Sequence, residues 1–185
     1  RVLFRATQLF MIYKKVNIIK YFEIKQVIQD DKINFEIVNR DNKEAIPFLG
    51  RSSTNNGIVG YVKKREGFVN NGGKITIALD GSTGATFYQH HDFSSGQNIW
   101  ELKPLGEFFE ELSPVIYLYL VTSIRKAVTE YSWNLSLTKK RLSNINIILP
   151  LQDNSDKVDT NFIKKQMNRI RNVSYLMNIP QTHAE

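Results

Sequence analysis

The chain has 185 residues, with 25 lysine and arginine residues against 18 aspartate and glutamate residues, so its net charge at neutral pH is +7. This length suits one domain of about 150 residues with an appendage, and the positive charge favours a polyanionic partner, nucleic acid before a membrane surface. The sequence contains no cysteine, which excludes a disulfide scaffold, a cysteine-ligated zinc site, an iron–sulfur cluster and a cysteine nucleophile, and which favours a reducing cytoplasm.

The N-terminal segment, residues 1–19, is basic and contains no acidic residue. It joins no apolar core to a small-residue cleavage site, so we expect a basic N-terminal extension and no secretion signal. The longest apolar stretch, residues 115–121, falls far short of the ~20 residues that a membrane-spanning helix needs. We therefore expect a cytoplasmic protein without a membrane partner.

Residues 21–86 favour short strands joined by tight turns. Apolar residues alternate with other residues at 33–37 and at 75–79, which is the period of two that half-buried strands show. The breaks between such segments are rich in glycine and asparagine, which tolerate positive φ and predict hairpin turns. These breaks are residues 55–57, 70–73 and 80–84. We expect a curved antiparallel or mixed sheet rather than βαβ units.

A long helix is predicted to begin at Ser113-Pro114, with the serine as N-cap and the proline as the first helical residue. Apolar residues from Ile116 to Tyr131 recur on one face at the helical period. Residues 144–149 then predict a last strand, stopped by Pro150. The expected fold class is therefore α+β, with a long helix packed on the sheet.

A linker and a second, shorter helix are predicted in residues 153–185. The helix spans about residues 160–178 and has Asp159 as its cap. Its apolar stripe either packs on the same domain or pairs with another subunit, as a spacer or dimerisation helix. The stripe consists of Phe162, Ile163, Met167, Ile170, Val173 and Met177.

Motifs of catalysis and cofactor binding are missing. Residues 67–74 look like a phosphate loop, but Phe68 stands where the first glycine is needed and Ile75 replaces the magnesium-binding hydroxyl residue. The run His90-His91-Asp92 is a poor metal site, because adjacent side chains on an extended chain point to opposite faces. We expect no catalytic residue, no metal and no cofactor.

The polar loops have the composition of a surface that reads DNA. Arginine pairs with guanine, asparagine and glutamine with adenine, and serine and threonine with either. The alternative is that these side chains only satisfy the backbone of their own turns, or form a solvated basic turn. The candidates for DNA contact are Arg51, Ser52, Ser53, Asn55, Asn56, Lys74, Ser82, Thr83, Tyr88, Gln89, Ser95 and Gln97, with Lys139, Lys140 and Arg141 as candidates for phosphate.

Seven segments stand out by their order and spacing along the chain. They are Ile46–Ser53, Asn55–Val62, Lys74–Ile77, Gly81–Gly84, Phe87–Gln89, Phe93–Ile99 and the closing strand Leu142–Pro150. Together they resemble the target recognition domain of type I-like restriction–modification specificity subunits, and the resemblance covers about residues 20–152.

The resemblance implies a non-catalytic module that selects a sequence in double-stranded DNA for a methyltransferase subunit and, in many systems, a nuclease subunit. Type I specificity subunits carry two such domains separated by long helices, whereas this sequence has one domain and a short helix after Asp159. Three readings stay open: a half-subunit that forms a homodimer through that helix, a truncated product, or one domain of a longer polypeptide such as a fused restriction–methylation enzyme.

A rival interpretation is a β module that binds RNA or carbohydrate by stacking. It predicts an exposed aromatic platform formed from Tyr88, Trp100 or Trp133. The target DNA sequence does not follow from residue identities, because base choice also depends on loop conformation and DNA shape.

Overall fold

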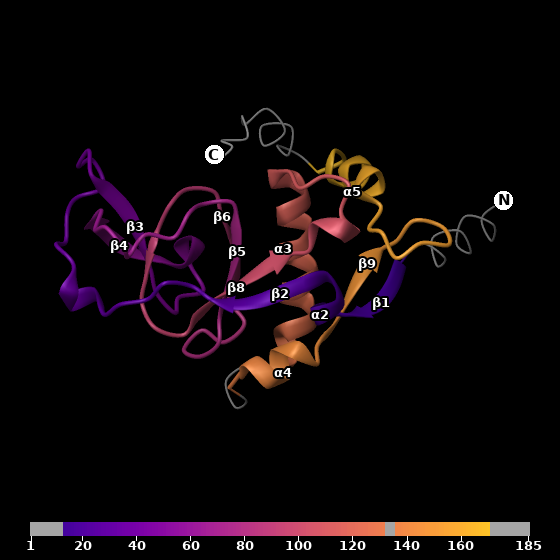
Figure 1. The fold of residues 1–185 in the computed structure, drawn as a ribbon, viewed down its shortest axis with the longest axis horizontal. Coiled ribbons are helices and arrows are strands. Elements are labelled where there is room, and N and C mark those ends of the chain that lie inside the picture. Colours follow the sequence, from indigo (N-terminus) through magenta and orange to yellow (C-terminus); the bar gives the residue numbers. More distant parts are fainter. Residues whose placement is uncertain (1–12, 132–135, 171–185) are drawn as a thin grey trace.

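The computed structural model describes residues 13–131 and 136–170. The fold is α+β, as the sequence predicts, and the described strands form three small sheets (Figure 1). The strands are β1 (Tyr13–Asn17), β2 (Phe22–Gln26), β3 (Ala45–Leu49), β4 (Ile58–Lys63), β5 (Lys74–Ala78), β6 (Thr86–Gln89), β7 (Ser94–Ser95), β8 (Ile99–Pro104) and β9 (Asn146–Pro150). The helices are α2 (Ile18–Tyr21), α3 (Pro114–Val128), α4 (Lys139–Ser143) and α5 (Thr160–Met167), and the 3-10 turns are η1 (Lys32–Asn34), η2 (Asn55–Gly57), η3 (Gly106–Phe108) and η4 (Thr129–Tyr131).

The main core lies between the four-stranded sheet and α3. The strand order is β2-β8-β5-β6, with β5 antiparallel to both of its neighbours. Ile75 and Ile77 of β5 are fully buried, as are Leu120 and Ile124 of α3. Burial of each such side chain contributes about 1.5–3 kcal/mol. The strand predicted around residues 75–79 and the apolar stripe predicted from residue 116 are thus confirmed, and Ile75 and Ile77 pack in one core with α3. The strand is not half-buried as predicted, because Thr76 and Ala78 on its other face are also buried.

Helix α3 begins at the predicted residue, but the reason differs from the prediction. Ser113 occupies the N-cap position with an extended backbone, yet its hydroxyl makes no cap hydrogen bond. Pro114 is the first helical residue, and its fixed φ suits this position. The proline therefore defines the start of the helix more than the serine does.

The strand predicted at residues 33–37 is wrong. Residues 32–34 form η1, and only Ile37 makes an isolated bridge, to Val62. Of the three alternating apolar residues, Ile33 and Ile37 are 90% and 67% exposed, and Phe35 alone is buried. Phe35 packs in a separate small cluster with Phe48, so the alternation here serves one anchor residue and no sheet face.

The first and last strands pair with each other. Strands β1 and β9 are antiparallel, with Tyr13 opposite Pro150. The predicted last strand is confirmed as β9, but Pro150 lies within the paired strand and does not stop it. The proline is tolerated there because a two-stranded sheet has only edge strands. Residues 13–19, expected in the N-terminal extension, therefore belong to the folded unit, while residues 1–12 lie outside the described residues.

Helix α5 packs on its own domain. The Asp159 carboxylate accepts a hydrogen bond from the Phe162 amide at 2.8 Å, which confirms the predicted cap. Ile163 is fully buried in the main core beside α3, so this member of the predicted partner stripe is used inside the domain. Ile170 is 54% exposed. The helix ends at Met167, and the predicted contacts Val173 and Met177 lie outside the described residues.

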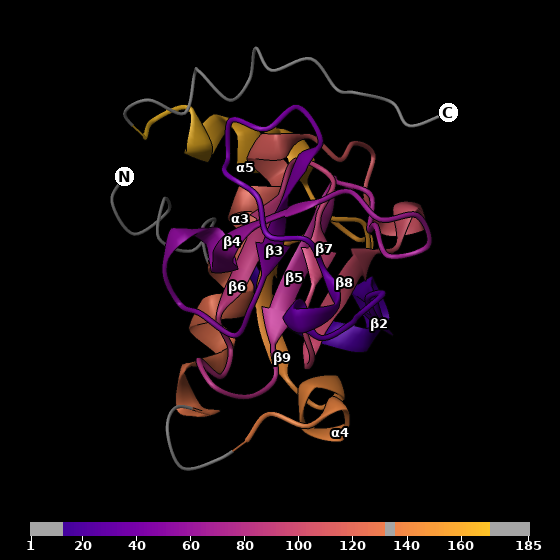
Figure 2. The same ribbon diagram turned by 90° about the vertical axis from the view of Figure 1, so that its left-hand side faces the viewer.

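The remaining sheet lies on the side of the molecule opposite to β1 and β9. It has the order β4-β3-β7, with β3 and β4 antiparallel and β7 parallel to β3. In Figure 1 the β3–β4 hairpin, the four-stranded sheet, α3 and the β1–β9 pair follow one another from left to right. The C-terminal end of α3 and helix α4 lie together at the lower end in Figures 1 and 2.

Candidate nucleic-acid interface

Two of the predicted DNA-reading loops meet in space. Arg51 Nη1 donates a hydrogen bond to Asp80 Oδ2 at 2.9 Å, and the Ser82 amide donates to the Arg51 carbonyl at 3.2 Å. A Cβ atom added at Gly81 would lie 2.9 Å from Arg51 Cβ, so the two backbones approach as closely as a glycine permits. The loop after β3 and the turn after β5 therefore form one surface.

This surface borders a pocket of about 620 Å³ at the C-terminal end of α3. The polar side chains that line it carry positive charge or hydroxyl groups, and the described lining includes no carboxylate. Such groups suit the phosphates and base edges of DNA. They are Arg51, Ser53, Ser82, Thr83, Arg125 and Thr129.

Arg125 also lines the pocket, although the sequence did not single it out as a candidate for DNA contact. Arg125 Nε donates to the Thr86 carbonyl at 2.7 Å, and the guanidinium lies 4.5 Å from the centre of the Phe87 ring. Burial lowers the pKa of Arg125. Nothing in the local sequence places Arg125 beside Arg51, because that neighbourhood depends on how α3 packs against β6.

The basic run of α4 lies at the same end of the molecule. The Leu137 amide donates to the carbonyl of Leu79, the residue before Asp80, at 3.1 Å. Lys139 Nζ lies 5.4 Å from the centre of the Trp100 ring. We call the surface formed by Arg51, Arg125, Lys139, Lys140 and Arg141 the basic end. All five side chains are exposed, and Figures 1 and 2 show α4 at this end from two directions.

Two predicted DNA-contact residues are buried and make hydrogen bonds within the chain. Gln89 is only 4% exposed, and its Nε2 donates to the carbonyl of Asn56 and to Thr76 Oγ1, both at 3.0 Å. Asn56 Nδ2 donates back to Gln89 Oε1 at 3.0 Å. Ser95 is 1% exposed, and its hydroxyl donates to the Gly96 carbonyl. The side chains of Gln89 and Ser95 are thus buried and bonded within the chain, and a DNA contact by either residue stays a prediction.

Other candidates lie away from the pocket or in local turns. Lys74, at the opposite end of β5 from the 80–84 turn, pairs with the buried carboxylate of Glu101 at 2.9 Å. Gln97 donates to the Asp31 carboxylate at 2.9 Å. Ser52 accepts from the Thr54 amide, and Asn55 donates to the Ile58 carbonyl, so both stabilise the loop between β3 and β4. A direct role of these four residues in DNA contact stays a prediction.

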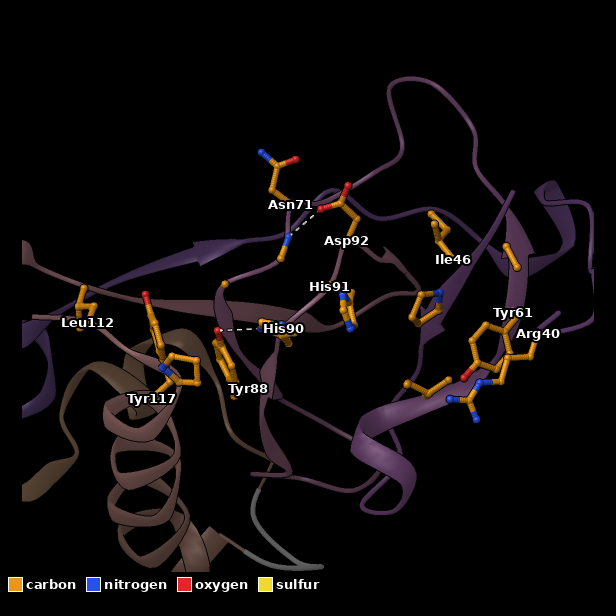
Figure 3. Close-up of a pocket in the computed structure, with 16 residues that line it drawn as sticks. Arg40, Ile46, Tyr61, Asn71, Tyr88, His90, His91, Asp92, Leu112 and Tyr117 are labelled. Atoms are coloured by element: carbon orange, nitrogen blue, oxygen red, sulfur yellow. Dashed lines mark hydrogen bonds between the residues drawn. The ribbon is translucent and has the colours of Figure 1, made fainter. Parts of the chain in front are cut away.

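A second concave surface, of about 800 Å³, separates the β3–β4 hairpin from the N-terminal end of α3 (Figure 3). Tyr88 and Tyr117 lie on one side of it, and Tyr61 and Arg40 lie on the other. The rings of Tyr88 and Tyr117 stack at 4.7 Å with an interplanar angle of 11°. Burial raises the pKa of Tyr117 to about 12. Burial and the adjacent His91 lower the pKa of His90.

These contacts bear on the rival stacking module. One face of Tyr88 is covered by Tyr117, and Lys139 lies over the ring of Trp100. Trp133 lies outside the described residues. Tyr88 and Trp100, the two described candidates for a stacking platform, therefore each already have a partner within the chain.

The described residues offer neither a metal-binding cluster nor a membrane-spanning helix. Among residues 13–131 and 136–170, no group of three or more histidine, aspartate or glutamate side chains could hold a metal ion. No helix in that part of the chain is long and apolar enough to cross a membrane.

Comparison with solved structures shows the fold. The HsdS subunit from Thermoanaerobacter tengcongensis superposes with a TM-score of 0.58 at 16% identity, over 94% of this chain and 40% of that one. The S subunit of a type I restriction–modification system from M. genitalium gives 0.55 at 15% identity, over 89% and 42%. A structure described as showing the complex assembly of a type I restriction–modification system gives 0.56 at 17% identity, over 85% and 37%.

The chain thus spans about 40% of the length of these solved proteins. No curated protein sequence matches it. A family model described as "Type I restriction modification DNA specificity domain" matches residues 13–174, which include all of the described strands and helices. The chain therefore belongs to the type I restriction–modification DNA specificity domain family.

Proposed function

We propose that this domain selects a sequence in double-stranded DNA through its basic end, without catalysis of its own. The observation that carries the proposal is the convergence of the Arg51 loop, the 80–84 turn, Arg125 and the basic run of α4 at one end of the fold. A cationic, hydroxyl-rich surface beside exposed loops has the chemistry that both DNA backbone binding and base reading require.

The residues of the basic end divide by position into two roles. Arg51, Ser53, Ser82 and Thr83 lie on the loops around the pocket and are proposed to contact base edges and the groove. Lys139, Lys140 and Arg141 lie on the exposed first turn of α4 and are proposed to contact phosphates.

The proposed partners are a DNA methyltransferase subunit and, in a complete restriction system, a nuclease subunit. We also propose a homodimer through the C-terminal helix, with fewer contact residues than the sequence predicts. Ile163 is buried in its own domain, and Ile170 is the exposed member of the stripe among the described residues. A two-fold pair of such domains would favour a palindromic split target.

A binding experiment with the methyltransferase subunit present tests the function. Each phosphate neutralised by a protein cation contributes about −0.9 to the slope of log K against log salt, so binding should weaken steeply with salt. Lys140→Ala should make this slope shallower by about 0.9 and leave the preferred sequence unchanged. Lys165→Ala, which removes an exposed lysine from α5, should leave both unchanged.

Selection from a pool of randomised duplexes gives the decisive outcome. Enrichment of a defined motif supports the proposal. Salt-insensitive binding, enrichment of no motif, or preferential capture of single-stranded RNA from a mixed pool would contradict it.

A further inference from the structure

Two arginines line the pocket of the basic end, and their electrostatic surroundings differ. Arg51 pairs with the Asp80 carboxylate at 2.9 Å, while its side chain remains 48% exposed. Arg125 is held by the Thr86 carbonyl and the Phe87 ring, and no described carboxylate forms an ion pair with it. Arg51 with its partner is close to neutral, whereas Arg125 brings a whole positive charge to the same pocket.

This difference matters because phosphate binding and base reading depend on different properties of an arginine side chain. Phosphate binding depends on net positive charge and on the release of counterions. Reading guanine instead depends on two correctly aimed N–H donors, which meet O6 and N7 in the major groove. Asp80 accepts from one nitrogen, Nη1, and a guanidinium has five N–H donors in a fixed planar arrangement. The bond to Asp80 therefore restricts the guanidinium at one nitrogen and leaves its other donors available to a base edge.

Asp80 is itself held in position by a hydrogen bond from Asn98. Asn98 Nδ2 donates to the same Asp80 oxygen at 2.8 Å, and the Asn98 carbonyl accepts from the Leu79 amide at 3.0 Å. The other oxygen, Asp80 Oδ1, is buried and has no hydrogen-bond partner among the described residues. An unpaired buried carboxylate oxygen costs stability, so the position of this carboxylate is poorly explained by folding alone.

We propose that Asp80 is a specificity-determining residue: it neutralises and orients Arg51 so that Arg51 reads a base edge, while Arg125 takes a backbone phosphate. The inference rests on the proposed function, since it assumes that the basic end binds DNA. It adds two assignments, a carboxylate that suppresses phosphate binding by its neighbour and a phosphate contact on α3.

The test measures the salt slope and the selected motif for each variant, with the full chain and its methyltransferase subunit. Arg125→Gln should make the slope shallower by about 0.9 without changing the motif. Asp80→Ala should make it steeper by about 0.9, because Arg51 becomes free to bind a phosphate. The same variant should lose about 10- to 100-fold of discrimination at one base pair. Asp80→Asn keeps an oxygen that accepts from Arg51, so it should steepen the slope while keeping part of the discrimination.

Matched controls remove the same charges elsewhere. These controls are Arg169→Gln and Glu107→Ala. Arg169 follows α5, Glu107 lies in η3, and both side chains are exposed. Neither should change the slope or the motif. In an Arg51→Ala background, Asp80→Ala should no longer change discrimination, because its effect acts through Arg51. A thermal melt of each variant shows that the fold is retained.

The outcomes separate the two levels of the argument. If wild type selects a motif but Asp80→Ala gives the same slope and the same motif, the inference is overturned and the proposed function stands. The inference is also overturned if Asp80→Ala weakens binding to all duplexes with an unchanged slope, as expected of a purely structural residue. If wild type itself selects no motif, the proposed function fails.

Discussion

Replacement of Gly84 by alanine should destabilise the fold at the junction between the 80–84 turn and α3. Gly84 has a φ of +80°, and an added Cβ would lie 2.8 Å from Val128 Cγ2 at the end of α3. The left-handed backbone costs a residue with a Cβ about 1–2 kcal/mol. The contact cannot be relieved by a small rotation, because valine is stiff at χ1, and such overpacking costs about 1–3 kcal/mol. The expected loss in the free energy of unfolding is therefore about 2–5 kcal/mol.

Urea unfolding followed by far-UV circular dichroism measures this loss as a shift of the midpoint at an unchanged slope m. Gly67→Ala is the matched control, because Gly67 has a φ of +76° and an added Cβ there would have no atom within 4 Å. It should lose only the backbone part, about 1–2 kcal/mol. The double variant Gly84→Ala/Val128→Ala should lose less than the sum of its single variants, because the contact is shared. Equal losses for Gly84→Ala and Gly67→Ala would refute the packing argument.

Three further predictions concern other parts of the fold. Lys74→Ala leaves the buried Glu101 carboxylate unpaired and should cost about 1–3 kcal/mol in urea unfolding. Adding Glu101→Gln should partly restore this stability. Equal stability of Lys74→Ala and wild type would contradict the prediction. The folded state lowers the pKa of His90, so the unfolded chain binds more protons than the folded chain as the pH falls through 6.5. The free energy of unfolding should therefore drop in this range. His90→Gln should show a smaller change in melting temperature than wild type between about pH 7.5 and about pH 5.5. Ile163→Ala should cost about 2–5 kcal/mol and Ile170→Ala less than about 0.5 kcal/mol, so similar losses in a thermal melt would contradict the observed burial.

The sequence predicted well those elements whose apolar pattern faces a neighbouring element of the fold. The alternation at Ile75 and Ile77 lies in a central strand, and the stripe of α3 packs on the face to which both side chains contribute. The alternation at residues 33–37 failed because periodicity does not show whether a neighbouring strand runs along the whole segment. The backbone of Glu36 and Val38 bonds to β4, whereas residues 32–34 form η1. Ile33, at 90% exposure, has no such neighbour.

The sequence named some of the residues that line the candidate site, but it did not predict their arrangement. Arg51 and the 80–84 turn were named from their chemistry, while their ion pair depends on two loops that are distant in sequence. Gln89 was named for the same chemistry, yet its amide is used to fix Asn56. Arg125 needed the packing of α3 to be known. Residue type determines which hydrogen bonds a side chain can make. Tertiary structure decides whether it makes them within the chain or is free to make them with a ligand.

The pairing of β1 with β9 places the two ends of the described domain side by side. Tyr13 is opposite Pro150, and its ring lies 5.6 Å from the ring of Phe162 in α5. The polypeptide therefore arrives and departs on one side, while the loop that carries Arg51 lies in the part of the chain between these strands. A domain with adjacent ends can be exchanged as a cassette without moving its neighbours. Exchange of the segment between β1 and β9 would then replace the Arg51 loop and the 80–84 turn while preserving the pairing of these two strands.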